Sequence, residues 1–192
     1  MDAVSTGPAA ALARGLAVFP IPPGQKIAPP GWHARASSDP GQPWPEGSNV
    51  GVGCRASGLV VLDLDRKDGV DGVAQLAALA DEHGQPWPAT FTVSTPSGGL
   101  HLYFAAPAWT VVNTIKVLAP GIDVRAPGRA LGGYVVGPGS IVGGRAYAIA
   151  EDLPIAALTS WIGRRLRATA ARRVLAPGWR AKTDDVRLSR PR

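Results

Sequence analysis

The chain of 192 residues has 45% hydrophobic and 18% charged side chains and a formal net charge of +6. This composition suits one compact domain with an apolar core, and it excludes a fibrous protein and a membrane-spanning one. Glycine and proline are abundant, with 24 and 19 residues, so we expect many loops. Apolar runs interrupt them, which excludes a disordered low-complexity chain.

The positive charge is concentrated near the C-terminus. Residues 1–163 hold ten Lys or Arg and twelve Asp or Glu, whereas residues 164–192 hold ten basic and two acidic residues. We therefore expect a body that is mildly acidic up to residue 163, and we divide the chain into a domain over residues 1–166 and a basic tail or linker over residues 167–192. In that tail, Arg172 and Arg173 are candidates for contacts with nucleic-acid phosphates.

The cysteine content and the N-terminal sequence bear on the compartment. Cys54 is the only cysteine, so a disulfide within the chain and a cysteine-rich zinc site are both excluded, and we expect no zinc. Asp2 and Arg14 interrupt the N-terminal apolar stretch, which argues against a secretory signal. No apolar run approaches the ~20 residues of a membrane span. We expect a cytoplasmic protein without a membrane partner.

The predicted elements begin with a short helix from Pro8 and a strand over residues 17–21. Residues 22–47 are rich in proline, which predicts a long irregular loop. Two apolar runs follow, over residues 49–54 and 59–65, with a short turn between them. They predict a β-hairpin whose second strand lies deep in a sheet.

A helix is expected over residues 70–83, where apolar residues recur at helical spacing and Gly84 marks the end. A last helix is expected from Pro154, a residue favoured in the first helical turn. Between these helices the pattern predicts strands over residues 90–95, 100–105, 121–125, 134–136 and 145–149. This mixed order predicts an α+β fold with helices packed against a sheet.

The sharpest local signal is the segment Val61-Leu62-Asp63-Leu64-Asp65. Alternate residues of a strand share a face, so Asp63 and Asp65 project together while the leucines face the core. Adjacent carboxylates repel unless a cation lies between them, and hard oxygen ligands suit Mg²⁺ or Mn²⁺. The alternative is that the strand ends at Leu62 and both aspartates cap the following turn.

Asp123 is the second signal, because it lies between apolar neighbours in a short predicted strand, where a carboxylate needs a partner. Arg125 shares its face, so one interpretation is a structural ion pair on an edge strand. The other is that Asp123 joins the first two aspartates in a two-metal site for phosphoryl transfer.

The third signal is the turn Ser97-Gly98-Gly99, which is followed by His101. Backbone N–H groups of such a turn can converge on an anion, and a histidine at the start of the next strand can donate to the same phosphate. The alternative is a common hairpin turn followed by a structural histidine.

Several segments, taken in chain order, carry a family resemblance: Lys26 with Gly31-Trp32, Ser38-Asp39-Pro40, Asn49-Val50-Gly51-Val52, and residues 57–65, 95–101 and 120–125. Together they resemble the bifunctional DNA primase/polymerase (prim-pol) N-terminal domain. This family is a branch of the archaeo-eukaryotic primase superfamily found in phage, plasmid and mobile-element replication proteins. The resemblance extends over about residues 9–166. Residues 137–140 depart from it, reading Gly-Pro-Gly-Ser where the family usually has Ala-Pro-Pro-Ser.

The resemblance implies the roles of the site residues. It makes Asp63, Asp65 and Asp123 the catalytic carboxylates, which bind two Mg²⁺ or Mn²⁺ ions, and it gives His101 a contact with the nucleotide phosphates. The further candidates for holding the triphosphate are Ser97, Gly98, Gly99 and Arg125. The implied fold is archaeo-eukaryotic primase-like, with an RRM-like catalytic sheet packed with a smaller α/β unit.

The implied function is that of a DNA primase/polymerase, which acts on a single-stranded DNA template, a primer and NTPs or dNTPs. Lys26 and Arg35 are further candidates for DNA contacts, and a helicase domain or subunit is a candidate partner. A bacterial host, with the protein encoded by a phage or plasmid, fits the resemblance. Two alternatives remain: a metal-dependent nuclease, which needs no triphosphate-binding turn, and a non-catalytic nucleic-acid-binding module whose affinity lies in the basic tail.

Overall fold

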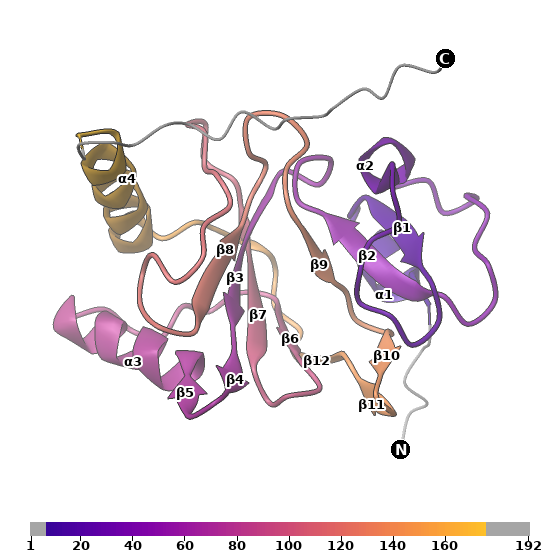
Figure 1. Cartoon of the computed structure of the whole chain (residues 1–192), viewed down its shortest axis with the longest axis horizontal. Coiled ribbons are helices and arrows are strands. Elements are labelled where there is room, and N and C mark those ends of the chain that lie inside the picture. Colours follow the sequence, from indigo (N-terminus) through magenta and orange to yellow (C-terminus); the bar gives the residue numbers. More distant parts are fainter. Residues whose placement is uncertain (1–6, 176–192) are drawn as a thin grey trace, which may run out of the picture.

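The computed structural model of the chain describes residues 7–175. Its main sheet runs in the order β12 (Ala148–Glu151), β6 (Thr92–Ser94), β7 (Leu100–Ala105), β3 (Leu59–Leu64) and β8 (Ile122–Arg125) (Figure 1). These neighbours are all antiparallel, and β13 (Ala156–Ala157) adds a parallel pair with β7. The small sheet, also antiparallel, has the order β1 (Val18–Ile21), β2 (Asn49–Gly53) and β9 (Tyr134–Val136).

The remaining elements are short hairpins and helices. The hairpins pair β4 (Arg66–Lys67) with β5 (Val70–Asp71), and β10 (Ile141–Val142) with β11 (Arg145–Ala146). The helices are α1 (Ala9–Leu12), α2 (Trp32–Arg35), α3 (Gly72–Glu82) and α4 (Ser160–Leu175). Among the described residues, no helix combines the length and the apolar character that a membrane crossing requires. The fold is mixed α and β with antiparallel sheets and few helices, as the sequence predicted.

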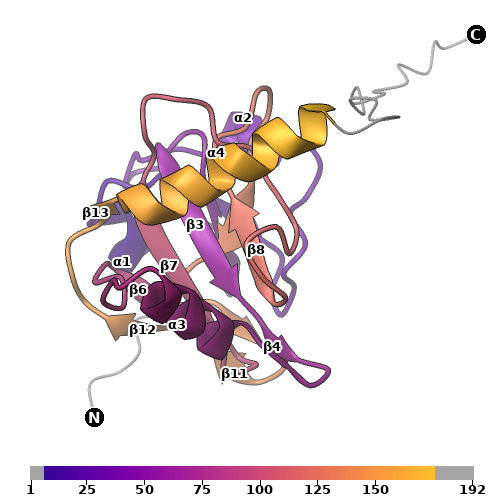
Figure 2. The ribbon, with the colours of Figure 1, turned by 90° about the vertical axis from the view of Figure 1, so that its left-hand side faces the viewer.

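The strand β3 separates two hydrophobic cores. Its residues Val60, Leu62 and Leu64 pack with α3 and α4, which both cross the same face of the main sheet (Figure 2). Leu59 and Val61 point the other way and pack with β1 and β2 of the small sheet. The alternation of the strand therefore places one face of the main sheet under helices and the other against the small sheet.

The predicted hairpin of residues 49–54 and 59–65 is wrong. β2 pairs with β1 and β9, whereas β3 pairs with β7 and β8, so the two strands belong to different sheets. The Leu59 N–H donates to the carbonyl of Cys54, and the chain passes from one sheet to the other there. Both strands are buried and need a partner on each side. Their apolar sequences indicate that need without indicating which strand meets it.

The predicted start of the last helix at Pro154 is also wrong, because α4 begins at Ser160. Ile155 packs against the core of the small sheet, and Leu158 packs against the core beneath the helices, so they cannot share one helical face. The predicted strand over residues 145–149 is likewise divided between β11 and β12.

The helix α3 begins two residues later than predicted, because Val70 and Asp71 form β5. The Asp71 carboxylate accepts from the N–H groups of Val73 and Ala74, at 2.9 and 3.0 Å, and caps the helix there. The predicted boundary between residues 166 and 167 lies within α4. Most of the predicted tail, residues 176–192, lies outside the described residues, as do the side chains of Arg172 and Arg173.

Candidate active site

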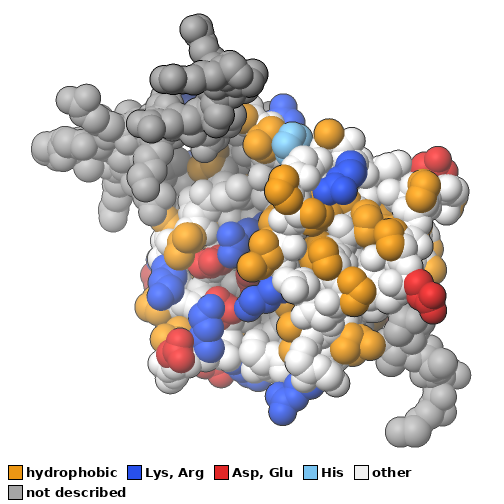
Figure 3. All heavy atoms as spheres, turned by 45° about the vertical axis from the view of Figure 1, so that its right-hand side comes forward, with side chains coloured by type: hydrophobic (Ala, Val, Ile, Leu, Met, Phe, Trp, Pro, Cys, Tyr) orange, Lys and Arg blue, Asp and Glu red, His pale blue; other side chains and the backbone are white. Residues whose placement is uncertain are grey.

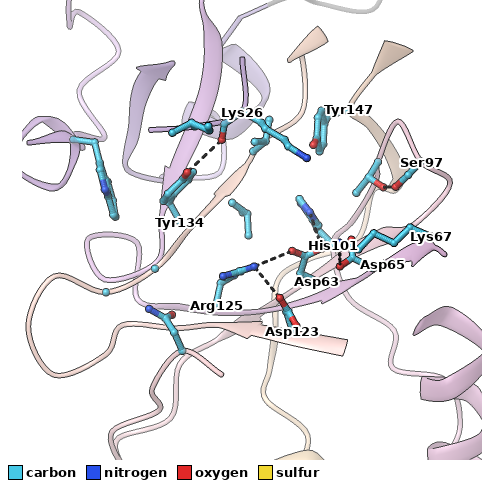
Figure 4. A pocket seen from close by; sticks show the side chains of 18 residues that line it. Lys26, Asp63, Asp65, Lys67, Ser97, His101, Asp123, Arg125, Tyr134 and Tyr147 are labelled. Atoms are coloured by element: carbon cyan, nitrogen blue, oxygen red, sulfur yellow. Dashed lines mark hydrogen bonds and ion pairs between the residues drawn. The ribbon is translucent and has the colours of Figure 1, made fainter. Parts of the chain in front are cut away.

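A cleft of about 520 Å³ opens between the two sheets (Figure 4). Asp63, Asp65 and Asp123 line it from the main sheet, and Lys26 and Tyr134 line it from the side of the small sheet. We call it the carboxylate cleft. On the face shown in Figure 3, basic and acidic side chains gather next to a largely hydrophobic area. The cleft therefore concentrates charge of both signs at the end of an apolar core.

Two paired strands bring the aspartates together. Asp63 of β3 lies directly opposite Asp123 of β8 in the strand register, and Asp65 follows the last residue of β3. Because β3 continues to Leu64, the alternative in which it ends at Leu62 is wrong. The three carboxylates that the sequence singled out therefore reach one cleft.

Three glycines fix the backbone around Asp65. The Asp65 N–H donates to the carbonyl of Gly121, and its own carbonyl accepts from the N–H of Gly72, both at 2.8 Å. A Cβ at Gly72 would lie 2.2 Å from the Gly121 oxygen, and one at Gly99 would lie 2.2 Å from the Leu64 oxygen. The chain segments approach so closely that no larger residue fits at these positions.

Each of the three carboxylates has a basic partner. Arg125 Nη2 lies 3.0 Å from Asp123 Oδ2 and 3.7 Å from Asp63 Oδ2, so one guanidinium lies between two carboxylates. His101 Nε2 lies 3.3 Å from Asp63 Oδ1. In the described chain, the cleft's own bases thus offset much of the carboxylate repulsion.

The pKa values of two aspartates shift in opposite directions. Burial would raise the pKa of Asp63, but the hydrogen bond and positive charge of His101 and the charge of Arg125 hold it below its ordinary value. Burial raises the pKa of Asp123, and the negative charges of Asp63 and Asp65 raise it further. Arg125 opposes this rise without cancelling it. Folding therefore favours the charged form of Asp63 and disfavours that of Asp123.

Lys67 and Tyr147 are among the residues of the cleft that the sequence reasoning missed. Lys67, on β4, has its Nζ 3.0 Å from Asp65 Oδ2, and this contact raises the pKa of the lysine. The only signal for it was its place in the turn directly after the aspartate pair. Tyr147 also lines the cleft, and burial, with the charges of Asp63 and Asp65, raises its pKa to about 12. No local pattern marked Tyr147, because it lies between two short strands far along the chain.

The predicted triphosphate-binding turn reaches the cleft only in part. Ser97 lines it, together with Thr95, whose hydroxyl oxygen is 3.1 Å from that of Ser97. Gly98 and Gly99 are not among the described residues that line the cleft. The Gly98 N–H donates to the Thr95 carbonyl at 2.9 Å, so it closes the hairpin turn between β6 and β7. The hydroxyl groups of the turn, more than its N–H groups, face the cleft.

The predicted basic contacts are divided in the same way. Lys26 lines the carboxylate cleft from the proline-rich loop. Arg35 is exposed at the end of α2, and its guanidinium donates to the carbonyl of Pro30 at 3.1 Å. Of the two predicted basic residues in the loop, only Lys26 therefore lines the cleft.

The donor chemistry of the cleft suits a divalent cation. Its three carboxylates supply the hard oxygen atoms that Mg²⁺ and Mn²⁺ prefer, and the charges of Asp63 and Asp65 add to burial in raising the pKa of Asp123. Within residues 7–175, no three His, Cys, Asp or Glu side chains are already arranged to hold a metal ion. Arg125 and Lys67 lie beside these carboxylates in the structure.

The whole cleft lies within the range of residues that one family model matches. The family model described as bifunctional DNA primase/polymerase, N-terminal, matches residues 8–161, a range that includes every residue lining the cleft. A search of the curated proteins gives no match. The matched range agrees closely with the predicted one.

Proposed function

The chain belongs to the bifunctional DNA primase/polymerase family, and we propose that its carboxylate cleft catalyses template-directed nucleotidyl transfer. One observation carries the proposal: Asp63, Asp65 and Asp123, from two paired strands, line the same cleft between the two sheets. In the reaction, the 3′-hydroxyl of a primer, or of an initiating nucleotide, attacks the α-phosphorus of a nucleoside triphosphate. A new P–O bond forms, pyrophosphate leaves, and the hydroxyl proton passes to solvent.

The three aspartates are the residues that would hold two Mg²⁺ or Mn²⁺ ions. Such ions, when bound, lower the pKa of the attacking hydroxyl and neutralise the leaving pyrophosphate. The protein's part is to present the carboxylates at fixed positions. The antiparallel pairing of β3 and β8 fixes Asp63 and Asp123, and the backbone contacts with Gly72 and Gly121 fix Asp65.

The bases of the cleft are suited to a triphosphate once the carboxylates have another partner. Arg125 can present two N–H groups to a phosphate in parallel, and Lys67 offers a compact ammonium group from the exposed β4–β5 hairpin. Ser97 adds a hydroxyl group beside them. We therefore propose that these three residues hold the phosphates while Lys26 closes the opposite wall.

His101 differs from the other basic residues of the cleft in its surroundings. It is buried, and its Nε2 faces Asp63. We propose that His101 orients the Asp63 carboxylate and that any contact with the nucleotide is made from this position. Partners of a metal ligand commonly act in this manner, because they fix the ligand's orientation and raise its basicity.

The topology also supports a finer interpretation of the fold. The order β6-β7-β3-β8, with α3 connecting β3 to β6, supports an RRM-like catalytic sheet, and we propose that the small sheet belongs to the second unit. We place the activity in phage- or plasmid-type DNA replication in the cytoplasm of a bacterial host. A single-stranded template and a primer are its macromolecular substrates, and a helicase is a candidate partner.

A primer-extension assay tests the proposal. The protein is incubated with a labelled primed template, dNTPs or NTPs, and Mg²⁺ or Mn²⁺, and a parallel reaction omits the primer. We expect nucleotide-dependent lengthening with the wild-type protein and none with Asp123→Asn. Asp81→Asn, on the exposed face of α3, is the matched control and should remain active.

The same assay separates the alternatives. Metal-dependent shortening of the primer, with no effect of added nucleotide, would identify a nuclease. Binding of DNA without any change in primer length, and without an effect of metal, would identify a non-catalytic module. Wild-type extension by Asp123→Asn would show that the cleft is not the site of the chemistry.

A further inference from the structure

A second pocket lies beside the carboxylate cleft, on the other side of Trp32. Its volume is about 460 Å³, within the ~300–1,000 Å³ of small-molecule sites. The described residues that line it are Trp32, His33, Ala36, Gly53, Arg55, Ala56, Ala130 and Leu131. Trp32 lines both the pocket and the cleft, so the two spaces share one indole ring. We call this space the Trp32 pocket.

The aromatic wall of the Trp32 pocket is held firmly. The Trp32 ring centroid lies 4.7 Å from that of Phe19 and 5.1 Å from that of Tyr134, so the indole is packed on two other rings. Gly53 keeps the space beside it open, since a Cβ there would lie 3.3 Å from the indole. Leu131 lines the same pocket and is 48% exposed, a large apolar side chain without full cover. The lining thus offers a fixed flat ring and an apolar contact.

The polar part of the pocket is basic. Arg55 and His33 are among its described lining residues, and none of those residues is acidic. Arg55 Nη1 donates to the carbonyls of Pro127 and Gly128, both at 3.3 Å, and so ties the β2–β3 turn to the loop that carries Leu131. Further arginines adjoin this lining in sequence, Arg35 on α2 and Arg129 beside Ala130, and both are exposed.

We propose that the Trp32 pocket binds one unstacked nucleobase of single-stranded DNA, stacked on the Trp32 indole, with its phosphate near Arg55. A flat aromatic wall accepts any base, and adjacent cations neutralise the backbone, which is the combination that single-strand binding requires. The shared indole places this base beside the carboxylate cleft. The identification of the strand as the template rests on the proposed function, but the binding of a base does not.

Binding is tested without chemistry. The fluorescence anisotropy of a fluorescein-labelled oligo-dT is followed in EDTA, with no nucleotide, for the full chain and for Leu131→Glu. A stacked base contributes a factor of about 5 to 150 in affinity, and a carboxylate at this position would oppose the phosphate, so we expect at least about fivefold weaker binding. Leu153→Glu, at an exposed leucine outside both pockets, is the matched control and should bind as the wild type does.

A second oligonucleotide of the same length, with abasic residues throughout, isolates the base. The wild-type protein should bind it more weakly than oligo-dT, and Leu131→Glu should show a smaller difference between the two. Ala56→Leu, which fills the pocket without a charge, provides a second variant whose thermal unfolding is compared with that of the wild type. Basic residues elsewhere in the chain add the same non-specific DNA affinity to the wild type and to each variant, so they do not affect the comparison.

The outcomes are distinct from those of the extension assay. Equal affinities of Leu131→Glu and Leu153→Glu for oligo-dT, or no preference of the wild type for bases over abasic DNA, would overturn the proposal. If Leu131→Glu binds a free nucleoside triphosphate more weakly than the wild type but binds oligo-dT equally well, the pocket belongs to the incoming nucleotide. That result would also overturn the proposal. A protein that stacks bases but never extends a primer would instead contradict the proposed function.

Discussion

Leu62 and Asp63 are neighbours in β3, yet they lie in very different surroundings. Leu62 is 0% exposed in the apolar core beneath α3 and α4. The Asp63 side chain is 19% exposed, and it faces a cleft with His101 and Arg125 beside it. The face of the main sheet beneath the helices carries a buried apolar core, whereas the opposite face carries the carboxylate cleft.

This difference separates stability from chemistry along one strand. Apolar burial on the helical face contributes to folding with no dependence on charge, and so the cleft face can carry three carboxylates. Charge substitutions in the cleft should then change the reaction more than the fold, and apolar substitutions under the helices should do the reverse. The predictions below test that separation.

The largest effect is expected for Asp65→Asn, which removes a cleft charge and keeps the shape of the side chain. Nucleotide incorporation should fall by more than the ~100-fold that loss of a metal ligand's outer partner can cost. Thermal unfolding should stay close to that of the wild type, because the ion pair with Lys67, which the substitution removes, is partly exposed and such pairs contribute little. If Asp65→Asn kept activity within tenfold of the wild type, the cleft charges would not be needed for the reaction.

Leu62→Ala should have the opposite profile. Truncation of a fully buried leucine typically lowers the free energy of unfolding by about 2–5 kcal/mol, and urea denaturation measures the loss. At a temperature where the variant is still folded, its extension rate per folded molecule should be near that of the wild type. Leu153→Ala, at an exposed position, serves as the control and should change stability by less than about 0.5 kcal/mol.

His101→Ala sharpens the comparison within the cleft. Because His101 Nε2 faces Asp63, the variant should bind Mn²⁺ about 10- to 100-fold more weakly in a calorimetric titration. Ser97→Ala, on the turn that lines the same cleft, should weaken triphosphate binding and leave the affinity for Mn²⁺ unchanged. An unaltered Mn²⁺ affinity in His101→Ala would limit the histidine to the nucleotide contact that the sequence suggested.

The smallest effects are expected in how the stability of the metal-free protein depends on pH. Folding lowers the pKa of Asp63 below 3.8, so its ionised form stabilises the protein at neutral pH, and this contribution is lost as the pH falls through the lowered pKa. Asp63→Asn should therefore be less stable than the wild type at about pH 7, with a smaller difference at about pH 3. Urea midpoints in EDTA measure both.

The contribution of Asp123 to stability should depend on pH in the opposite direction. Folding raises its pKa above 3.8, so its contribution to stability is present below that value and is lost as the pH rises through the raised pKa. Asp123→Asn should then be at least as stable as the wild type at about pH 7, and the gain should shrink on acidification. Two variants that shift in the same direction would show that the ion pairs of the cleft do not distinguish these carboxylates.

The sequence by itself determined the elements whose cause is local. The alternation of Leu62, Asp63 and Leu64 defined a strand with one apolar and one acidic face. The glycine-rich segment that begins at Ser97 indicated the turn between β6 and β7. Helical spacing located α3, with Gly84 in the left-handed conformation just past its end. The family resemblance joined these segments into one catalytic hypothesis and extended over nearly the range that the family match covers.

Only the tertiary structure decided which strands pair and which bases meet the carboxylates. Apolar runs record how deeply a strand is buried, but its partner depends on contacts far apart in the chain, so β2 and β3 could not be assigned to different sheets from their sequences. The same holds for Trp32 and Tyr147. Their places in the Trp32 pocket and the cleft depend on which loops the packing of the two sheets brings together, and no local period encodes that packing.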